Sequence, residues 1–560
     1  MKLEKLKSVE INAIEKPAQI AVPPFADQSK LRDRIFGALC RINPELPCME
    51  DETFLKRVFV CIKAANNDKD EMMYQPQQGV SYVKYMKENS VVQKWRKWYT
   101  DEKERKAEYR KAHKDELKKE SDERKAKYGV CKVNGEEDTL ATGWALESEG
   151  IFFGRGDSPA NGYWKVATQP EDVTVNTNGK KPILIENQLD GSHVEKSFNW
   201  NVQWDPDFHG AAKYKINIGV PNANGKLTKV KKSSMKILMF SSVKKEGQEK
   251  KYNAGATLGV AYEKIITKVT KDLKTLSADK AGTAIAVFFL FEKGIRIGNK
   301  EATENGTKGL LSLVWGKDVK RKNNKIKFDF YGKDSVRDTS EIETEFAEKI
   351  EKHWLKFNQL NTTKNAIKEY IAQIVPELDG VFTPKLARTA VAAYTAQKAL
   401  DEVTAELKVT KDSPLALKKL AIDEATMRVA KRLNHQRGVN KAAEEKRKAK
   451  FAESEAKLDE RKAKVKEQIA KKTAKIEELK KKGDKEKIKA LKEQIKTAKA
   501  KLETAEMSLE AKSRNANFTS NTAKNSYIDP SIIAAFCEKI ELPIEKVYSK
   551  AQLKNFDFAL

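Results

Sequence analysis

The segment from Lys441 to Lys512 constrains the fold of this 560-residue chain more than any other. It is rich in Lys, Glu and Ala, contains no Pro, and has a single Gly. Its apolar residues recur at alternating steps of three and four, the heptad spacing of a coiled coil, at Ile488, Leu491, Ile495, Ala498, Leu502, Ala505 and Leu509. A looser upstream seam is formed by Phe451, Leu458, Val465, Ile469 and Ile476. With the turn Lys482-Gly483-Asp484 between the seams, the pattern predicts an antiparallel helical hairpin of roughly thirty residues per arm.

The charge balance favours a polyanionic partner. Lys and Arg number 108 against 81 Asp and Glu, a formal net charge of +27. Each neutralised phosphate releases condensed counterions, so nucleic acid is the first candidate and an anionic membrane surface the second. The membrane alternative is weak because the most apolar stretch, Ala284 to Phe291, is far shorter than the ~20 residues of a membrane-spanning helix. The charged start of the chain has no apolar core of a signal peptide.

The five cysteines are scattered, and no two have the C-x-x-C spacing of a zinc site. An odd, sparse set also argues against a secreted disulfide framework, so we expect buried thiols and a reducing compartment. They are Cys40, Cys48, Cys61, Cys131 and Cys537.

Composition divides the chain into four regions, and together they predict a helix-dominated α+β protein. Residues 1–242 combine a long, highly charged helix from Trp95 to Lys127 with β-rich, loop-rich sequence from about residue 129. Residues 243–438 are mainly helical and contain the alternating strand KIKFDFY, followed by a turn at Gly332-Lys333-Asp334. The coiled-coil linker occupies 439–513.

A short terminal domain, residues 514–560, follows the linker. Asp529 is well placed to cap a helix that begins at Pro530. Tyr527 therefore lies just before a helix start, on a segment whose direction the cap fixes.

Two common kinds of phosphate chemistry are not supported by the sequence. It contains no G-x-x-x-x-G-K-[ST] loop, so ATP use is not expected, and no carboxylate cluster suggests a metal site. Phosphodiester transfer without a metal needs fixed cations around the phosphorus, for which arginine forks are suited. It also needs a proton donor such as Lys or His for the leaving oxygen and a side-chain nucleophile to hold the broken strand.

Five motifs in chain order resemble those of eukaryotic-type DNA topoisomerase IB. They are GIRIGNKEAT (294–303), IKFDFYGKDSVR (326–337), FTPKLARTA (382–390), LNHQRG (433–438) and TAKNSYIDPSI (522–532). GIFFGRGDSP (150–159) and the ending LPIEKVYSKAQLKNFDFAL are also similar to that family, and the hairpin lies where the family has its linker. The resemblance spans about residue 16 to the last residue. It implies a bilobed DNA clamp, with a catalytic domain of the tyrosine recombinase/topoisomerase IB type.

The resemblance also assigns roles to individual residues. Arg296 and Arg388 would clamp the scissile phosphate, and His435 would bond a non-bridging oxygen. Lys333 would protonate the leaving 5′-oxygen, and Tyr527 would attack phosphorus to give a 3′-phosphotyrosyl link. Double-stranded DNA would be the partner of a monomeric enzyme that relaxes positive and negative supercoils without ATP or metal.

Further DNA contacts are implied at Arg155, Asn299, Lys524, Ser526 and Asp334. Ser526 stands where the family usually has Asn, close to where camptothecin-type inhibitors intercalate, so we expect reduced camptothecin sensitivity. The chain begins close to the family's core, without the long charged extension of nuclear members. We therefore expect a compact protist or virus-encoded enzyme, located in the nucleus or, if it is virus-encoded, at a viral replication site.

Two alternatives remain open at this stage. A tyrosine recombinase uses a similar Arg, Lys/His, Arg, Tyr set, but would need site specificity and a multimeric synapse. A non-enzymatic architectural DNA-binding protein would show salt-dependent binding and no change in linking number. The hairpin itself is either a solvated spacer or a basic surface that contacts DNA.

Overall fold

The computed structural model describes residues 5–66, 74–154, 158–275, 281–301, 306–333, 336–437 and 441–559. The chain divides into two compact units, Met1–Gly247 and Gln248–Leu560. This boundary lies within helix α6 (Ser241–Val260). The boundaries of the four predicted domains remain predictions.

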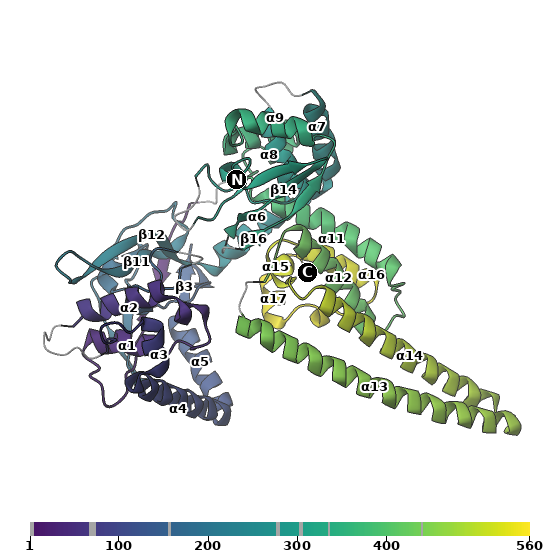
Figure 1. Cartoon of the computed structure of the whole chain (residues 1–560), viewed down its shortest axis with the longest axis horizontal. Helices are drawn as coiled ribbons and strands as arrows, with labels where there is room; N and C mark the ends of the chain where they lie inside the picture. Colours follow the sequence, from purple (N-terminus) through teal and green to yellow (C-terminus); the bar gives the residue numbers. More distant parts are fainter. Residues whose placement is uncertain are drawn as a thin grey trace. The chain divides into compact units, whose positions relative to one another are not determined.

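The first unit combines a helical layer with small sheets (Figure 1). Its helices are α1 (Leu31–Cys40), α2 (Glu52–Ala64), α3 (Tyr82–Glu88), α4 (Ser90–Ala112) and α5 (Lys114–Tyr128). Its strands are β1 (Val9–Ile11), β2 (Ala13–Lys16), β3 (Val130–Val133), β4 (Glu136–Thr139), β5 (Gly150–Ile151), β6 (Trp164–Val166), β7 (Thr174–Val175), β8 (Ile183–Asn187), β9 (His193–Lys196), β10 (Asn201–Val202), β11 (Gly210–Pro221) and β12 (Leu227–Met239). The largest sheet has the order β10-β7-β11-β6-β5, with β12 paired to β11.

The predicted charged helix is divided into two, α4 and α5. The break lies at His113, whose backbone leaves the helical region at φ −110° and ψ 31°. The His113 ring nitrogen Nδ1 lies 3.0 Å from the Tyr109 carbonyl oxygen, and the two rings stack. Most side chains of both helices are exposed, as the charge pattern predicted.

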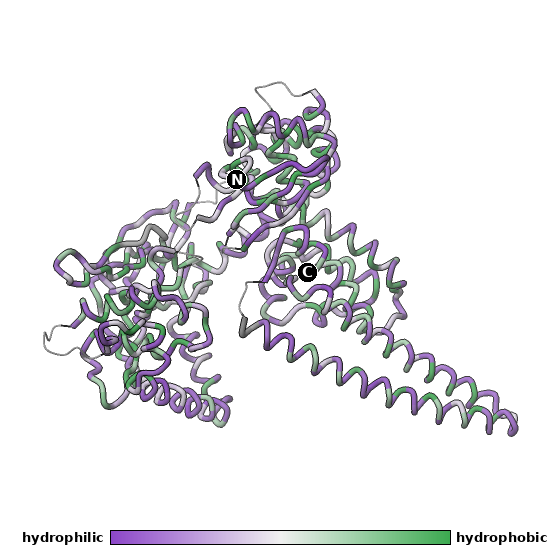
Figure 2. Tube along the Cα trace, in the orientation of Figure 1, coloured by the Kyte–Doolittle hydropathy of each residue, from purple (hydrophilic) through white to green (hydrophobic). Residues whose placement is uncertain are grey.

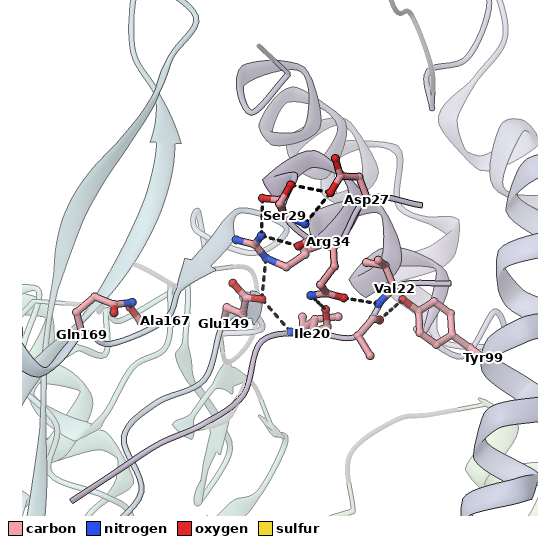
Figure 3. Close-up of polar contacts among 11 residues, drawn as sticks. Ile20, Val22, Asp27, Ser29, Arg34, Tyr99, Glu149, Ala167 and Gln169 are labelled. Carbon is pink, nitrogen blue, oxygen red and sulfur yellow. Dashed lines mark hydrogen bonds and ion pairs between the residues drawn. The ribbon is translucent and has the colours of Figure 1, made fainter. Parts of the chain in front are cut away.

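A buried polar network in this unit fixes the segment that leads into β5 (Figure 3). Glu149 accepts hydrogen bonds from Arg34 Nε at 3.1 Å and from the Ile20 amide at 2.9 Å. Arg34 also donates to the Ser29 carbonyl, and Tyr99 donates to the Ala21 carbonyl. The Arg34 and Glu149 side chains are only 11% and 6% exposed. Because Glu149 immediately precedes β5, the network anchors the start of the GIFFGRG segment.

The second unit is mainly helical. Besides α6, its helices are α7 (Tyr262–Thr275), α8 (Ala281–Glu292), α9 (Ala347–Phe357), α10 (Lys364–Ile374), α11 (Leu386–Glu406), α12 (Leu415–Arg432), α13 (Lys441–Lys482), α14 (Lys485–Arg514), α15 (Asn521–Ser526), α16 (Pro530–Lys539) and α17 (Lys550–Asn555). Its strands are β13 (Val319–Lys322), β14 (Lys325–Phe328), β15 (Phe330–Tyr331), β16 (Arg337–Asp338) and β17 (Glu341–Glu343). The fold is thus α+β and helix-dominated, as predicted.

Helix α8 is the centre of this unit. Its residues from Ala281 to Phe291 are all buried, so it is apolar on every side and is surrounded by α7, α9, α10 and α11. This is the apolar stretch that is too short to span a bilayer. Among the described residues, no helix is long and apolar enough to cross a membrane.

The predicted hairpin is present as α13 and α14, which lie side by side (Figure 1). The turn is at Gly483, with φ +72°, and the Asp484 side chain caps α14 by accepting from the Lys487 amide at 3.2 Å. The predicted seam residues are among the less exposed positions of both arms, and Figure 2 shows hydrophobic positions recurring among hydrophilic ones along the hairpin. Lys462 and Glu506 form an ion pair between the arms at 3.1 Å. At 42 residues, α13 is longer than the predicted arm.

The hairpin starts and ends at adjacent points. The Arg437 amide donates to the Asn517 carbonyl at 2.8 Å, and the Thr519 amide donates to the His435 carbonyl at 3.0 Å. Between these bonds, Gln436 and Phe518 form an antiparallel bridge. The chain therefore leaves the globular part of the unit and re-enters it at the same place.

Candidate active site

Tyr527 is held at the junction of two short helices. Its amide donates to the Ala523 carbonyl at 3.0 Å, which ends α15. Asp529 then caps α16 as predicted, accepting from the Ser531 amide at 2.9 Å, with Pro530 in the first helical position. The tyrosine thus lies on a segment with little freedom, and its side chain is only partly exposed.

Arg296 lies on an extended segment after α8. Gly298 in this segment has φ +66°, and a Cβ there would lie 2.6 Å from the Gly309 Cα. This close approach allows the Leu310 amide to donate to the Arg296 carbonyl at 2.8 Å. With the backbone fixed in this way, Arg296 Nη1 donates to the Tyr527 hydroxyl at 2.9 Å.

Arg388 projects from the first turn of α11 and is 6% exposed. Its guanidinium donates to the Leu433 carbonyl at 2.9 Å and to the Gly294 carbonyl, and it lies 5.0 Å from the centre of the Tyr527 ring. Burial, followed by the charge of Arg296, lowers the pKa of Arg388 to about 10, so it stays positively charged at neutral pH. Two arginine cations therefore flank one tyrosine.

His435 follows α12 and completes the cluster. Its Nε2 lies 3.1 Å from Arg388 Nη2, and its ring centre is 5.2 Å from that of Tyr527. Burial, together with the charges of Arg388 and Arg296, lowers the pKa of His435 to about 3. The imidazole is therefore neutral at physiological pH, and Nε2 accepts from Arg388 while Nδ1 carries the proton. Nδ1 is buried and has no hydrogen-bond partner among the residues that the structure describes.

The two arginines alter the acidity of the tyrosine. Burial alone would raise the pKa of Tyr527, but the charges of Arg388 and Arg296 outweigh burial and lower the pKa below its ordinary value. A phenol with a lowered pKa is a better nucleophile near neutral pH, because more of it is ionised. The arrangement thus combines an activated hydroxyl with cations that can neutralise the developing charge of a phosphate.

A cavity of about 140 Å³ adjoins this cluster. It is lined by Arg296, Arg388 and His435, and also by Lys333, which lies in the loop between β15 and β16. The predicted strand KIKFDFY is interrupted at Asp329, so β14 and β15 are separate strands. Lys333 is exposed, as a side chain at a turn is expected to be.

Three further charged residues line the cavity and were not predicted, namely Lys293, Lys308 and Asp338. Lys308 is neutralised by Asp318 at 2.6 Å. Asp338 is 8% exposed, and its charge partly offsets the burial that lowers the pKa of Lys293. Lys293 immediately precedes the motif GIRIGNKEAT (294–303), and nothing in its spacing distinguished it from the chain's many other lysines.

Three family models match the chain in order. They are "Eukaryotic DNA topoisomerase I, DNA binding fragment" over residues 49–217, "Eukaryotic DNA topoisomerase I, catalytic core" over 240–471, and "C-terminal topoisomerase domain" over 499–560. The core match contains Arg296, Lys333, Arg388 and His435, and the C-terminal match contains Tyr527. The chain belongs to the eukaryotic-type DNA topoisomerase IB family.

Curated relatives agree with this assignment. The chain is 29% identical to DNA topoisomerase 1 alpha of Arabidopsis thaliana over 483 residues, which is 83% of this chain and 49% of the relative. It is 28% identical to DNA topoisomerase 1 of Xenopus laevis over 77% of this chain and 50% of the relative. Identity to the Homo sapiens protein of the same name is 26%, over 78% and 55%. The chain thus spans about half the length of the curated relatives it matches.

The other DNA contacts implied by resemblance to the topoisomerase IB family lie outside the cavity or outside the described residues. Asn299 accepts from Lys364 at 2.6 Å in a separate surface hollow. Lys524 donates to the Val547 carbonyl at 3.1 Å. Ser526 is exposed beside the tyrosine. Arg155 and Asp334 lie outside the described residues.

No metal site emerges from the described part of the chain, where no group of three or more His, Cys, Asp or Glu could hold an ion. The cysteines are free, and Cys48 is half-buried whereas the other four are buried.

Proposed function

We propose that this chain is a type IB DNA topoisomerase that relaxes positively and negatively supercoiled double-stranded DNA without ATP or metal. The observation that carries the proposal is the hydrogen bond from Arg296 to the Tyr527 hydroxyl, with Arg388 and His435 in the same cluster. This geometry suits a reaction in which a tyrosine oxygen attacks a phosphodiester between fixed cations.

In the proposed step, the Tyr527 oxygen forms a bond to phosphorus as the bond from phosphorus to the 5′-oxygen breaks. The phenolic proton is lost to solvent, and Lys333 gives a proton to the leaving 5′-oxygen. The product is a 3′-phosphotyrosyl link and a free 5′-hydroxyl. Religation reverses each transfer, so no external source of energy is needed.

Arg296 and Arg388 would neutralise the non-bridging oxygens, whose charge rises in the five-coordinate state. The neutral His435 would act as a hydrogen-bond donor and not as a cation. To donate from Nε2, the His435 ring must carry its proton on Nε2 instead of Nδ1. This tautomer becomes available when the Arg388 guanidinium turns toward the phosphate and no longer donates to Nε2.

The remaining assignments belong to the same proposal. The enzyme would act as a monomer, with a cap region (1–242), a catalytic region (243–438), a linker (439–513) and a C-terminal domain (514–560) forming a clamp on duplex DNA. Arg155, Asn299, Lys524, Ser526 and Asp334 would contribute DNA contacts. The proposed location is the nucleus, or a viral replication site for a virus-encoded enzyme.

The decisive experiment is relaxation of negatively supercoiled plasmid in EDTA without ATP, comparing the wild type with Tyr527→Phe. We expect relaxation by the wild type alone, and a covalent protein–DNA adduct on the 3′ side of the break. Relaxation by both proteins would show that Tyr527 is not the nucleophile. Binding without relaxation by either would favour an architectural role, and activity confined to one DNA sequence in a multimer would favour a recombinase.

A further inference from the structure

Two neighbouring residues of α6 bind the end of α15, the helix that immediately precedes the nucleophile. Lys251 Nζ donates to the Ser526 carbonyl at 3.0 Å, and the Tyr252 hydroxyl donates to the Asn525 carbonyl at 3.5 Å. The last carbonyls of a helix have no partner within the helix, and a cation there is favourable. Helix α15 has only six residues, so these contacts satisfy a large share of its free carbonyls.

The Ser526 carbonyl and the Tyr527 amide belong to the same planar peptide group. Lys251 holds the oxygen of this group, while its N–H donates to the Ala523 carbonyl at 3.0 Å. The peptide plane between Ser526 and Tyr527 is therefore held both at its carbonyl oxygen and at its amide N–H. A rotation of that plane would move the tyrosine hydroxyl relative to Arg296 and to any bound phosphate.

The position of the Lys251 ammonium is itself well determined. It lies 3.9 Å from the centre of the Tyr252 ring and also donates to the Gln248 side chain. Tyr252 is 1% exposed and stacks against Phe558. Lys251 is thus not a mobile surface lysine but part of a packed support behind the tyrosine.

We propose that Lys251 is a positioning residue for the nucleophile, acting through the Ser526 carbonyl to fix the peptide group that carries Tyr527. The inference rests on the proposed topoisomerase function. In this role Lys251 does not contact the reacting phosphate. Loss of Lys251 therefore affects the placement of the attacking oxygen and not the charge around phosphorus. Cleavage and religation share one transition state, so both rates should fall together.

The support is sensitive to pH. The titratable groups that face the Lys251 amine are Tyr252 on its own helix and, from the nucleophile segment, Tyr527 and Asp529. Burial lowers the pKa of Lys251 to about 8, against the opposing effect of Tyr527 and Asp529. Below about pH 8, the charged Lys251 ammonium donates a charge-assisted hydrogen bond to the Ser526 carbonyl. Above that pH, the neutral amine donates a weaker hydrogen bond. An arginine would stay charged throughout this range.

The test compares Lys251→Met, which removes charge and donor, with Lys251→Arg, which keeps both. Lys244→Met is the matched control, since Lys244 is an exposed lysine on the same helix. Single-turnover cleavage is measured on a duplex whose short fragment with the free 5′-hydroxyl diffuses away, and religation is measured after a 5′-hydroxyl oligonucleotide is added. Both rates are followed from about pH 6 to about pH 10, with DNA affinity and melting temperature measured in parallel.

We expect Lys251→Met to cleave and religate about tenfold more slowly, with DNA affinity close to that of Lys244→Met. Lys251→Arg should recover most of the rate, and its rate relative to the wild type should rise as the pH passes about 8. Wild-type rates in Lys251→Met would overturn the inference. Equal losses of rate and melting temperature in the Met and Arg variants would overturn it too, leaving only a packing role. Failure of the topoisomerase proposal itself appears separately, as absence of relaxation by the wild type.

Discussion

Arg296 donates a hydrogen bond to the hydroxyl of Tyr527 at 2.9 Å, although 231 residues separate them in the chain. This bond brings together a segment after the central helix of the second unit and a segment beyond the coiled coil. It also ties the acidity of the phenol to an arginine charge, which gives the first prediction.

Replacing Arg296 with Ala should reduce single-turnover cleavage by about 10²- to 10³-fold, the usual loss for one donor at a developing oxyanion. Since the arginine charges lower the pKa of Tyr527, removing one should raise that pKa and shift the alkaline rise of the rate to higher pH. A pH–rate profile measures both effects. Arg428→Ala serves as a control, because Arg428 pairs with Glu402 and Glu406. An unshifted profile would mean that Arg296 does not act on the phenol.

His435 should remain neutral throughout the physiological range. With its pKa lowered to about 3, its ring resonances in NMR should not titrate between about pH 5 and about pH 8. The folded state binds fewer protons than the unfolded state between the ordinary histidine pKa and about 3, so stability should fall as the pH decreases through that window. In His435→Gln, this fall should be shallower. A ring that titrates near the ordinary histidine value would contradict the prediction.

Glu149→Ala should destabilise the first unit by about 3 kcal/mol, because it leaves Arg34 buried without its carboxylate. Asp101→Ala breaks the exposed ion pair with Lys97 and should lower the stability far less, because water and salt screen this pair. Calorimetry of the whole chain can compare the two variants. Similar melting curves for both would show that the network in Figure 3 contributes little.

Ser526→Asn should increase trapping of the covalent complex by camptothecin. Ser526 is exposed beside Tyr527, and the substitution supplies an amide donor that serine lacks. The measurement is the fraction of enzyme bound covalently to labelled DNA at increasing drug concentration. Equal trapping of both proteins would contradict the expected low sensitivity of the natural sequence.

The sequence was most informative where a repeating pattern or a local rule determines structure. The heptad seam predicted the hairpin, and Asp529-Pro530 predicted the start of α16. Both features depend on interactions between residues close together in the sequence. The length of α13 and the break at His113 were not predicted. At His113 the ring contacts the Tyr109 carbonyl and side chain, an arrangement that the charge pattern of this segment does not indicate.

The cluster around Tyr527 was accessible from motif order but not from residue types. Arg388, buried among backbone carbonyls, looks in the sequence like any other arginine of a basic chain. The role of Lys251 is still harder to predict from the sequence, because it depends on a carbonyl 275 residues away. Contacts of that kind follow from packing of α6 against the C-terminal segment, which no local pattern encodes.

The bridge between Gln436 and Phe518 at the base of the coiled coil makes the hairpin a modular appendage. Since residues 435–437 and 517–519 are bonded to one another, the path of the chain toward Tyr527 is set at the base and not at the tip. The hairpin is a loop of chain closed at its base, and lengthening such a loop adds little to the entropic cost of closing it. Removing one heptad from each arm would shorten the reach of the hairpin by about 10 Å and leave the tyrosine in place. The length of the hairpin can therefore change in evolution without altering the active site next to its base.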